Sequence, residues 1–213
     1  MHVAFDIGNV LCEFDLDKFT YEMFKTTGIP TSRAYNFLES IQNAQDIGLT
    51  TVRKSLQMLI PPPPHSLYLK DTEIDHLINA WCSIIYPSEM MINFLDNLRS
   101  EGIKIALLSN MGKEHHEYLM NKYPKLFTGV VQHISYEVGA RKPAKLFFQS
   151  FMLDHDDFKG AAYIDDIEEN CRAAKKYSFK VYKFDLKETL KLKQSEQKIE
   201  LTKLRNIIIS QNI

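Results

Sequence analysis

Polar side chains suited to phosphoryl chemistry occur where short apolar runs of this sequence end, and in one loop. They are Asp6, Ser109, Asn110, Lys142, Asp165 and Asp166. Together they supply one carboxylate that could act as a nucleophile, a hydroxyl and an amide that could bind oxygens, a cation, and two adjacent carboxylates. These groups are suited to bind and transfer a phosphoryl group together with a hard metal ion.

Each of these residues also has an ordinary interpretation. Asp6 precedes Gly8 and could belong to a simple turn, and Ser109 with Asn110 could cap the following helix. Lys142 could be a solvated loop charge. The pair at 165–166 could begin a helix, but adjacent carboxylates repel each other unless a cation offsets them, which favours a Mg²⁺ site.

Four compact apolar runs are typical of strands that are buried on both faces. They cover residues 2–5, 103–108, 130–134 and 160–164. The stretches between the later runs, 90–100, 113–123 and 144–152, have helical spacing. This alternation predicts an α/β fold with a doubly wound parallel sheet. In such a sheet, ligands bind beyond the carboxyl ends of the strands, where the polar side chains lie.

Residues 16–87 follow a different pattern, because their apolar stripes are helical and no buried strand is apparent. We predict an α/β core formed by residues 1–15 and 88–213, with an α-helical cap at 16–87 inserted after the first strand. The four prolines at 61–64 predict a stiff connector within the cap. The helical stripe at 195–213 either packs on the core or meets a partner.

Composition limits the class of protein. The length of 213 residues predicts one domain with an insertion or two small domains. A net charge of -1 gives no reason to expect nucleic acid or a membrane as a partner. Three scattered cysteines argue against a disulfide framework, and the N-terminus shows no leader pattern, so we expect a cytoplasmic protein. The oligomeric state is left open.

Four motifs in order resemble those of the haloacid dehalogenase-like (HAD-like) superfamily of hydrolases. They read FDIGNVL, LLSN, GARKP and IDDIEEN, and the segment QDIGLTT resembles a signature of that superfamily's helical cap. The first and third motifs are most similar to those of bacterial sugar-phosphate phosphatases. The resemblance covers nearly the whole chain and implies a phosphatase that acts on a small phosphorylated metabolite.

The resemblance also implies roles for individual residues. Asp6 would attack phosphorus and form an aspartyl-phosphate. Mg²⁺ would be held by the Asp6 carboxylate, the Gly8 carbonyl and Asp166, with Asp165 as a close or water-bridged second carboxylate. Ser109 and Asn110 would bind the phosphoryl oxygens, and Lys142 would neutralise their charge in the transition state.

The sequence departs from the usual superfamily pattern at Gly8, where most of these phosphatases carry the Asp that protonates the leaving group. Glu13, Asp15 and a residue of the cap are conceivable replacements, although Glu13 and Asp15 are both expected to be solvated loop acids. The departure motivates an alternative: a catalytically impaired protein that binds a protein partner through the cap or the stripe at 195–213. Carbon–halogen hydrolysis is a weaker alternative, because it needs no Mg²⁺ and leaves the carboxylate pair unexplained.

One further run, Glu114-His115-His116-Glu117, lacks the spacing that places two histidines on one helix face for zinc. We predict that this run lies on a solvated helix.

Overall fold

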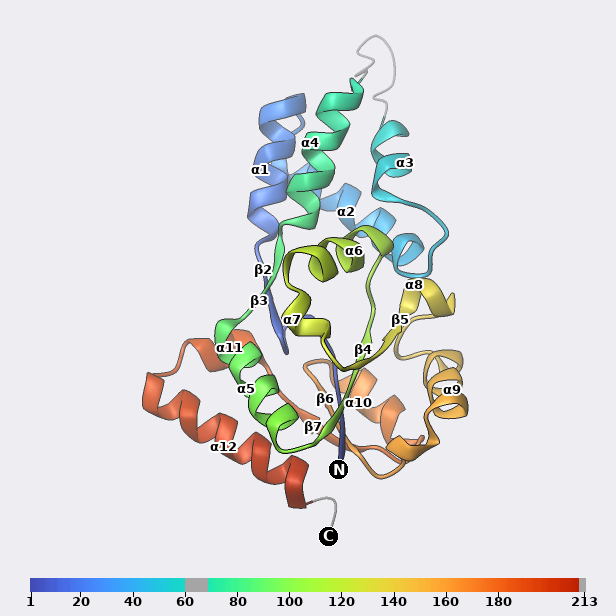
Figure 1. Ribbon diagram of the computed structural model, residues 1–213. Coiled ribbons are helices and arrows are strands. Elements are labelled where there is room, and N and C mark those ends of the chain that lie inside the picture. Colours follow the sequence, from blue (N-terminus) through green and yellow to red (C-terminus); the bar gives the residue numbers. More distant parts are fainter. Residues whose placement is uncertain (60–68, 211–213) are drawn as a thin grey trace.

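A parallel five-stranded sheet forms the base of the protein in a computed structural model that describes residues 1–59 and 69–210 (Figure 1). The strand order is β5-β4-β1-β6-β7. The strands are β1 (His2–Phe5), β4 (Lys104–Ser109), β5 (Val131–Ile134), β6 (Ala162–Asp165) and β7 (Lys180–Lys183). Strand β1 lies in the centre and pairs in parallel with both β4 and β6. The predicted fold class is therefore confirmed.

Helices cover both faces of this sheet. They are α5 (Glu89–Ser100), α6 (Lys113–Lys122), α7 (Pro124–Phe127), α8 (Ser135–Val138), α9 (Lys145–Asp154), η1 (Asp156–Phe158), α10 (Glu168–Lys175), α11 (Leu186–Leu190) and α12 (Gln194–Ser210). Because side chains alternate along a strand, Val3 and Phe5 of β1 join the cluster that α5, α6, α11 and α12 cover. Ala4 faces the opposite cluster, with the phenylalanines of α9.

The C-terminal helix packs on the core, which decides between the two roles considered for that segment. Leu204 and Ile208 of α12 are buried in the same cluster as Phe94 of α5. Ile199 remains 54% exposed. The apolar stripe of α12 is therefore largely used inside the molecule.

A helical region rises above the carboxyl end of the sheet (Figure 1). It consists of α1 (Leu16–Thr27), α2 (Thr31–Asp46), α3 (Val52–Gln57) and α4 (Asp71–Cys82). Helix α1 contacts both α2 and α4, and α3 contacts α4. The prolines at 61–64 fall outside the described residues. The cap boundaries at 16 and 87 stay a prediction.

A two-stranded antiparallel ribbon joins the helical region to the sheet region, and the sequence did not predict it. Strand β2 (Cys12–Phe14) pairs with β3 (Ile85–Pro87), so that Glu13 lies opposite Tyr86. Each strand has only three residues, which is too short to show a period of two. The ribbon places the start and the end of the helical region side by side.

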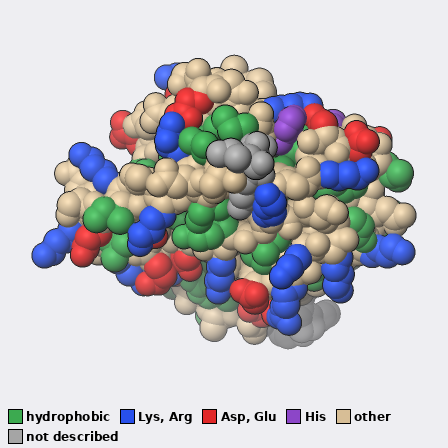
Figure 2. Space-filling model, turned by 90° about the horizontal axis from the view of Figure 1, so that it is seen from below, with side chains coloured by type: hydrophobic (Ala, Val, Ile, Leu, Met, Phe, Trp, Pro, Cys, Tyr) green, Lys and Arg blue, Asp and Glu red, His purple; other side chains and the backbone are tan. Residues whose placement is uncertain are grey.

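The outer surface carries both signs of charge. Figure 2 shows the end of the molecule that lies at the bottom of Figure 1, where Lys and Arg side chains are interspersed with Asp and Glu. Among the described residues, no helix is long and apolar enough to cross a membrane. Cys12, Cys82 and Cys171 are all buried free thiols.

Candidate active site

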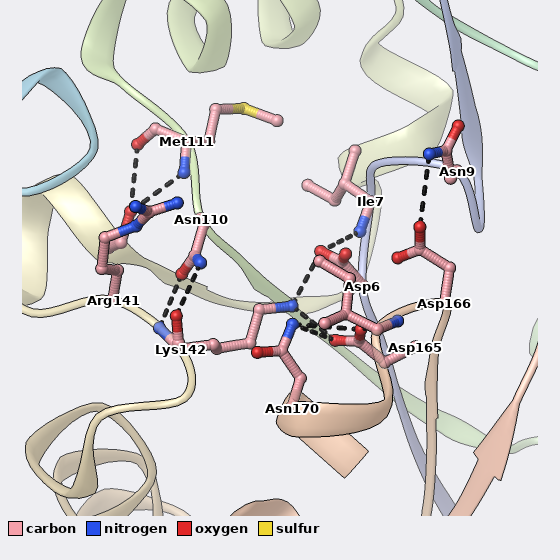
Figure 3. A network of polar contacts seen from close by, with 12 residues as sticks. Asp6, Ile7, Asn9, Asn110, Met111, Arg141, Lys142, Asp165, Asp166 and Asn170 are labelled. Carbon is pink, nitrogen blue, oxygen red and sulfur yellow. Dashed lines mark hydrogen bonds and ion pairs between the residues drawn. The ribbon is translucent and has the colours of Figure 1, made fainter. Parts of the chain in front are cut away.

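The carboxyl ends of two neighbouring strands, β1 and β6, bring the predicted carboxylates together. Asp6 follows β1, Asp165 ends β6, and Asp166 comes directly after it. Lys142 reaches the same point from the loop between α8 and α9 (Figure 3). The parallel sheet therefore gathers residues that are up to 160 positions apart in the sequence.

Lys142 forms a buried ion cluster with two of the carboxylates. Its Nζ lies 2.9 Å from Oδ1 of Asp6 and 2.8 Å from Oδ2 of Asp165. Burial alone would lower the pKa of Lys142, but the negative charges of Asp6 and Asp165 outweigh burial and raise the pKa above its usual value. An ammonium group has three N–H donors. Two face these carboxylates, which leaves one for another acceptor.

The two carboxylate oxygens of Asp6 have different surroundings. Oδ1 accepts hydrogen bonds from the backbone N–H of Ile7 (2.7 Å) and from Lys142. Oδ2 accepts none from any described residue. Burial raises the pKa of Asp6 to about 7; Lys142 opposes this rise, while the charges of Asp165 and Asp166 add to it. One oxygen is thus held in place, and the other is available for a metal ion or for attack.

Asp165 is enclosed, with both oxygens occupied. Besides Lys142, it accepts hydrogen bonds from the Tyr163 hydroxyl, from the backbone N–H of Ile167 (2.8 Å) and from Nδ2 of Asn170 (3.1 and 3.2 Å). Its exposed fraction is 0%. These contacts hold the Asp165 carboxylate in one position.

Asp166 is only partly buried and has far fewer contacts. Its Oδ2 accepts one hydrogen bond, from Nδ2 of Asn9 at 3.2 Å. Burial raises the pKa of Asp166, and the adjacent charge of Asp165 raises it further. A nearby cation would stabilise the ionised form of such a carboxylate.

The donor set fits a divalent hard cation. One carboxylate oxygen from each of Asp6, Asp165 and Asp166 lies within 4.8 Å of the others. Mg²⁺ prefers such oxygen ligands and retains several waters when it is bound by one or two carboxylates. Because the oxygens of Asp165 are occupied, Asp6 and Asp166 are the residues with oxygens free for the ion. The Gly8 carbonyl, which accepts no hydrogen bond within the described part of the chain, is a further candidate.

The contact of Ser109 and Asn110 with phosphoryl oxygens stays a prediction, and the structure shows how the two residues are held. The Asn110 side chain bonds the backbone of Lys142 twice, through Nδ2 to its carbonyl (2.9 Å) and through Oδ1 from its N–H (2.7 Å). Asn110 therefore holds the main chain of the lysine in position. Ser109 is 2% exposed at the end of β4. Neither residue caps α6, which begins at Lys113 with Gly112 as its N-cap.

The space beside Gly8 is occupied by an aromatic ring. A Cβ atom at Gly8 would lie 2.9 Å from Cε2 and 3.1 Å from Cζ of Phe14. An acid at this position would therefore require Phe14, which is 43% exposed, to move. The expectation of a solvated loop acid holds for Asp15, which is exposed between β2 and α1, and was wrong for Glu13, which is partly buried. Glu13 lies in β2, and Asp15 caps α1 by accepting from the Lys18 N–H at 3.1 Å.

The two adjacent histidines are buried, so the prediction of a solvated helix was wrong for that face of α6. His115 lies 4.6 Å from Trp81 between ring centroids and bonds its carbonyl oxygen through Nε2 at 2.9 Å. Nε2 of His116 lies 2.7 Å from Oε1 of Gln132. Burial lowers the pKa of His115 to about 4, although its bond to the Trp81 carbonyl opposes the shift. Both histidines serve packing.

Four residues for which the sequence indicated no role support the carboxylates or the cap. Asn9, Tyr163 and Asn170 each donate to one of the carboxylates. Asn170 lies on the first turns of α10, and its spacing from the carboxylate pair was a usable signal. Arg141 lies 3.0 Å from Oδ2 of Asp46 at the end of α2, and it joins the lysine loop to the helical region.

A cavity of about 850 Å³ lies beside Asn9 and Asn110, whose side chains bond Asp166 and the Lys142 backbone. Asn9, Asn110 and Met111 line it from the sheet side, and α2 and α4 line it from the helical region. It is large enough for a small organic ligand.

Comparison with known proteins shows the fold. No protein-family model matches the chain, and no curated protein matches it. Among solved structures, a HAD family enzyme of Bacteroides thetaiotaomicron, in complex with magnesium and inorganic phosphate, superposes with a TM-score of 0.71 and 24% identity over 85% of this chain and 92% of that one. A predicted HAD-like family hydrolase of Porphyromonas gingivalis gives 0.64 and 20% over 86% and 90%.

A more distant neighbour has another chemistry. L-2-haloacid dehalogenase of Xanthobacter autotrophicus, with chloropropionic acid covalently bound, gives a TM-score of 0.57 and 16% identity over 95% of this chain and 82% of that one. The fold of this chain is thus the one shared by these HAD enzymes and dehalogenases.

Proposed function

We propose that this protein is a HAD-like hydrolase: a Mg²⁺-dependent phosphatase that cleaves a small phosphomonoester, such as a sugar phosphate, through an aspartyl-phosphate intermediate. The observation that carries this proposal is the arrangement around Asp6. Its Oδ1 is held by Ile7 and Lys142, its Oδ2 is free, and a carboxylate oxygen of Asp166 lies within 4.8 Å. The fold shared with an enzyme crystallised with magnesium and phosphate supports it.

In the proposed reaction, Oδ2 of Asp6 attacks phosphorus, forming a P–O bond as the bond to the leaving oxygen breaks. A bound Mg²⁺, held by Asp166, by the Gly8 carbonyl and by the Asp6 oxygen that does not attack, would supply positive charge between the anionic nucleophile and the anionic substrate. Lys142 donates its third N–H to a phosphoryl oxygen and stabilises charge in the transition state. Asn110 keeps the lysine in place through its backbone.

Release of the leaving group needs a proton, and Gly8 supplies none. Asp15 is engaged as the cap of α1. Glu13 lines the cavity, and its carboxylate accepts no hydrogen bond from the described residues. Of the two acids suggested by the sequence, Glu13 is the better placed to give this proton, and the transfer would be worth about 10² to 10⁴ in rate.

The occupied space at Gly8 favours one second candidate, a catalytically impaired protein that binds a protein partner. Because Leu204 and Ile208 of α12 are buried in the core, the helical cap is the surface left for such a partner. Two results together would favour this candidate. The protein would hydrolyse none of the phosphates in the test below, and it would form a stable complex with a protein that binds the surface of the helical cap.

The test measures phosphate release from aryl phosphate and from a panel of sugar phosphates, with Mg²⁺ and with a chelator. We expect release that requires Mg²⁺ and falls at least about 10³-fold in Asp6→Asn, since the nucleophile is lost. Asp156→Asn, a change at an exposed surface acid, is the matched control. Chloride release from L-2-chloropropionate without phosphate release would identify a dehalogenase instead.

A further inference from the structure

One arginine joins helix α2 to the loop that carries Lys142. Arg141 directly precedes this lysine in the chain. Its Nη1 donates a hydrogen bond to Oδ1 of Asn43, and its Nη2 lies 3.0 Å from Oδ2 of Asp46. Asn43 and Asp46 are three positions apart in α2, so they share one face of that helix. The planar guanidinium therefore holds the last turn of α2 at two points.

Within the described part of the chain, no other hydrogen bond or ion pair joins α2 to the sheet region. The two approach each other closely beyond these contacts. A Cβ atom at Gly48, just after α2, would lie 2.8 Å from the carbonyl oxygen of Tyr136, and one at Gly112 would lie 3.4 Å from Cβ of Gln45. Such packing has little directional preference, whereas a charge-assisted contact fixes both distance and orientation.

Lys142 is held independently of the Arg141 side chain. Asn110 bonds the backbone of Lys142 twice, and Nζ of Lys142 is paired with Asp6 and Asp165. Removal of the guanidinium would leave all of these contacts in place. The freedom gained would therefore belong to α2 and not to the lysine.

Helix α2 forms one wall of the cavity beside the site. Leu38, Glu39 and Gln42 line the cavity from α2, and Asn9 and Asn110 line it from the sheet region. A group that fills this cavity is enclosed only while α2 keeps its place against the sheet region. Its binding therefore depends on the contact that holds α2 there.

From these contacts, and resting on the phosphatase function proposed above, we propose that Arg141 is a positioning residue that fixes the α2 wall of the cavity relative to Lys142. It acts on the part of the substrate beyond the phosphoryl group and does not touch the reacting atoms. Burial raises the pKa of Asp46 to about 6, against the opposing charge of Arg141. The ion pair is thus complete at pH 8.

Kinetics at pH 8 with two phosphates of different size test this role. For the sugar phosphate that the native chain hydrolyses fastest, Arg141→Met should raise KM about tenfold, since the fraction of molecules with α2 in place falls to about a tenth, and leave kcat within about twofold. For acetyl phosphate, whose leaving group is far smaller than the cavity, both constants should stay within about twofold. Arg53→Met, which removes an exposed arginine paired with Asp75 inside the helical region, is the matched control and should change nothing.

A double variant separates positioning from folding. Arg141→Met leaves the carboxylate of Asp46, which is 5% exposed, without its cation and so lowers stability. Adding Asp46→Asn removes that charge. We expect the double variant to recover urea resistance and to keep the raised KM, because the guanidinium that holds α2 is still absent. Recovery of KM together with stability would show a structural role alone and overturn the inference.

Spin labels give a readout that needs no catalysis. They are attached to Asn36→Cys, at an exposed position of α2, and to Leu153→Cys, at a 78% exposed position of α9, because the native cysteines are buried. Pulsed EPR should give a narrow distance distribution when Arg141 is present and a broader one in Arg141→Met and in the double variant. If the native chain hydrolyses no phosphate, the phosphatase proposal fails, while these distances still decide whether Arg141 positions α2. Equal distributions with and without Arg141 would overturn the inference.

Discussion

Asp165 and Asp166 are adjacent, yet their surroundings predict opposite consequences when each is changed to Asn. Asp165 is fully buried and accepts from Lys142, Tyr163, Ile167 and Asn170. An amide there places an NH₂ group among donors and removes one of the two carboxylates that hold the lysine. Breaking a buried charge cluster of this kind costs about 3 to 5 kcal/mol.

Asp166→Asn should cost little in the metal-free protein. Its carboxylate accepts one bond of 3.2 Å, and burial together with Asp165 raises its pKa, so the folded state gains little from its charge. We expect the free energy of unfolding to change by no more than about 1 kcal/mol. What this variant loses is a ligand oxygen for Mg²⁺.

Urea unfolding with a chelator, and then with Mg²⁺, separates the two effects. At a concentration 100 times the dissociation constant, a ligand that binds only the folded state stabilises it by about 2.7 kcal/mol. Mg²⁺ should raise the free energy of unfolding by this amount in the native chain and in Asp165→Asn, although Asp165→Asn starts from a lower free energy of unfolding. In Asp166→Asn, Mg²⁺ should raise it hardly at all. The surface control Asp156→Asn should behave like the native chain. A full Mg²⁺ gain in Asp166→Asn, with none in Asp165→Asn, would refute the assignment.

Three further changes have clear expectations. Gly8→Asp should lower the free energy of unfolding by about 1 to 3 kcal/mol, because its Cβ meets Phe14; adding Phe14→Ala should restore urea resistance, and its failure to do so would contradict the clash. For His115, the folded pKa of about 4 lies below the usual 6.5, so its contribution is complete above about pH 6.5 and falls by up to about 3 kcal/mol as pH drops toward 4. His115→Gln should flatten that pH dependence of unfolding. Arg141→Met leaves Asp46 unpaired, and since the pKa of that carboxyl is raised to about 6, we expect a loss of about 2 kcal/mol at pH 8 and less at pH 5, measured by thermal unfolding.

Four strands of the main sheet, β1, β4, β5 and β6, could be predicted because each reads as a compact apolar run. The edge strand β7 is exposed or partly buried along its length and does not form such a run. The polar residues at 6, 109 and 165 follow such runs, so their convergence at the carboxyl edge depended only on the strands being parallel. The β2–β3 ribbon could not be predicted in this way. Its partners, such as Glu13 and Tyr86, are 73 positions apart, and three residues are too few to establish a pattern.

The roles of single polar side chains were harder to predict than their positions. The resemblance implies a phosphate contact for Asn110, which stays a prediction, but the hydrogen bonds of its side chain to the backbone of Lys142, 32 positions away, were not foreseen. The buried state of His115 depends on the approach of Trp81 from another helix, which no local period reveals. Motif spacing thus locates the site, whereas long-range packing determines which group each residue contacts.

The central position of β1 also affects how the chain can fold during synthesis. Its neighbours in the sheet begin at Lys104 and Ala162, so the first strand made must wait for most of the chain to leave the ribosome before its two edges are paired. Helix α1 and the two helices that it contacts, α2 and α4, are complete much earlier. We expect a slow folder with high contact order, in which Val3, Ala4 and Phe5 form an apolar segment that a chaperone can hold until β6 arrives.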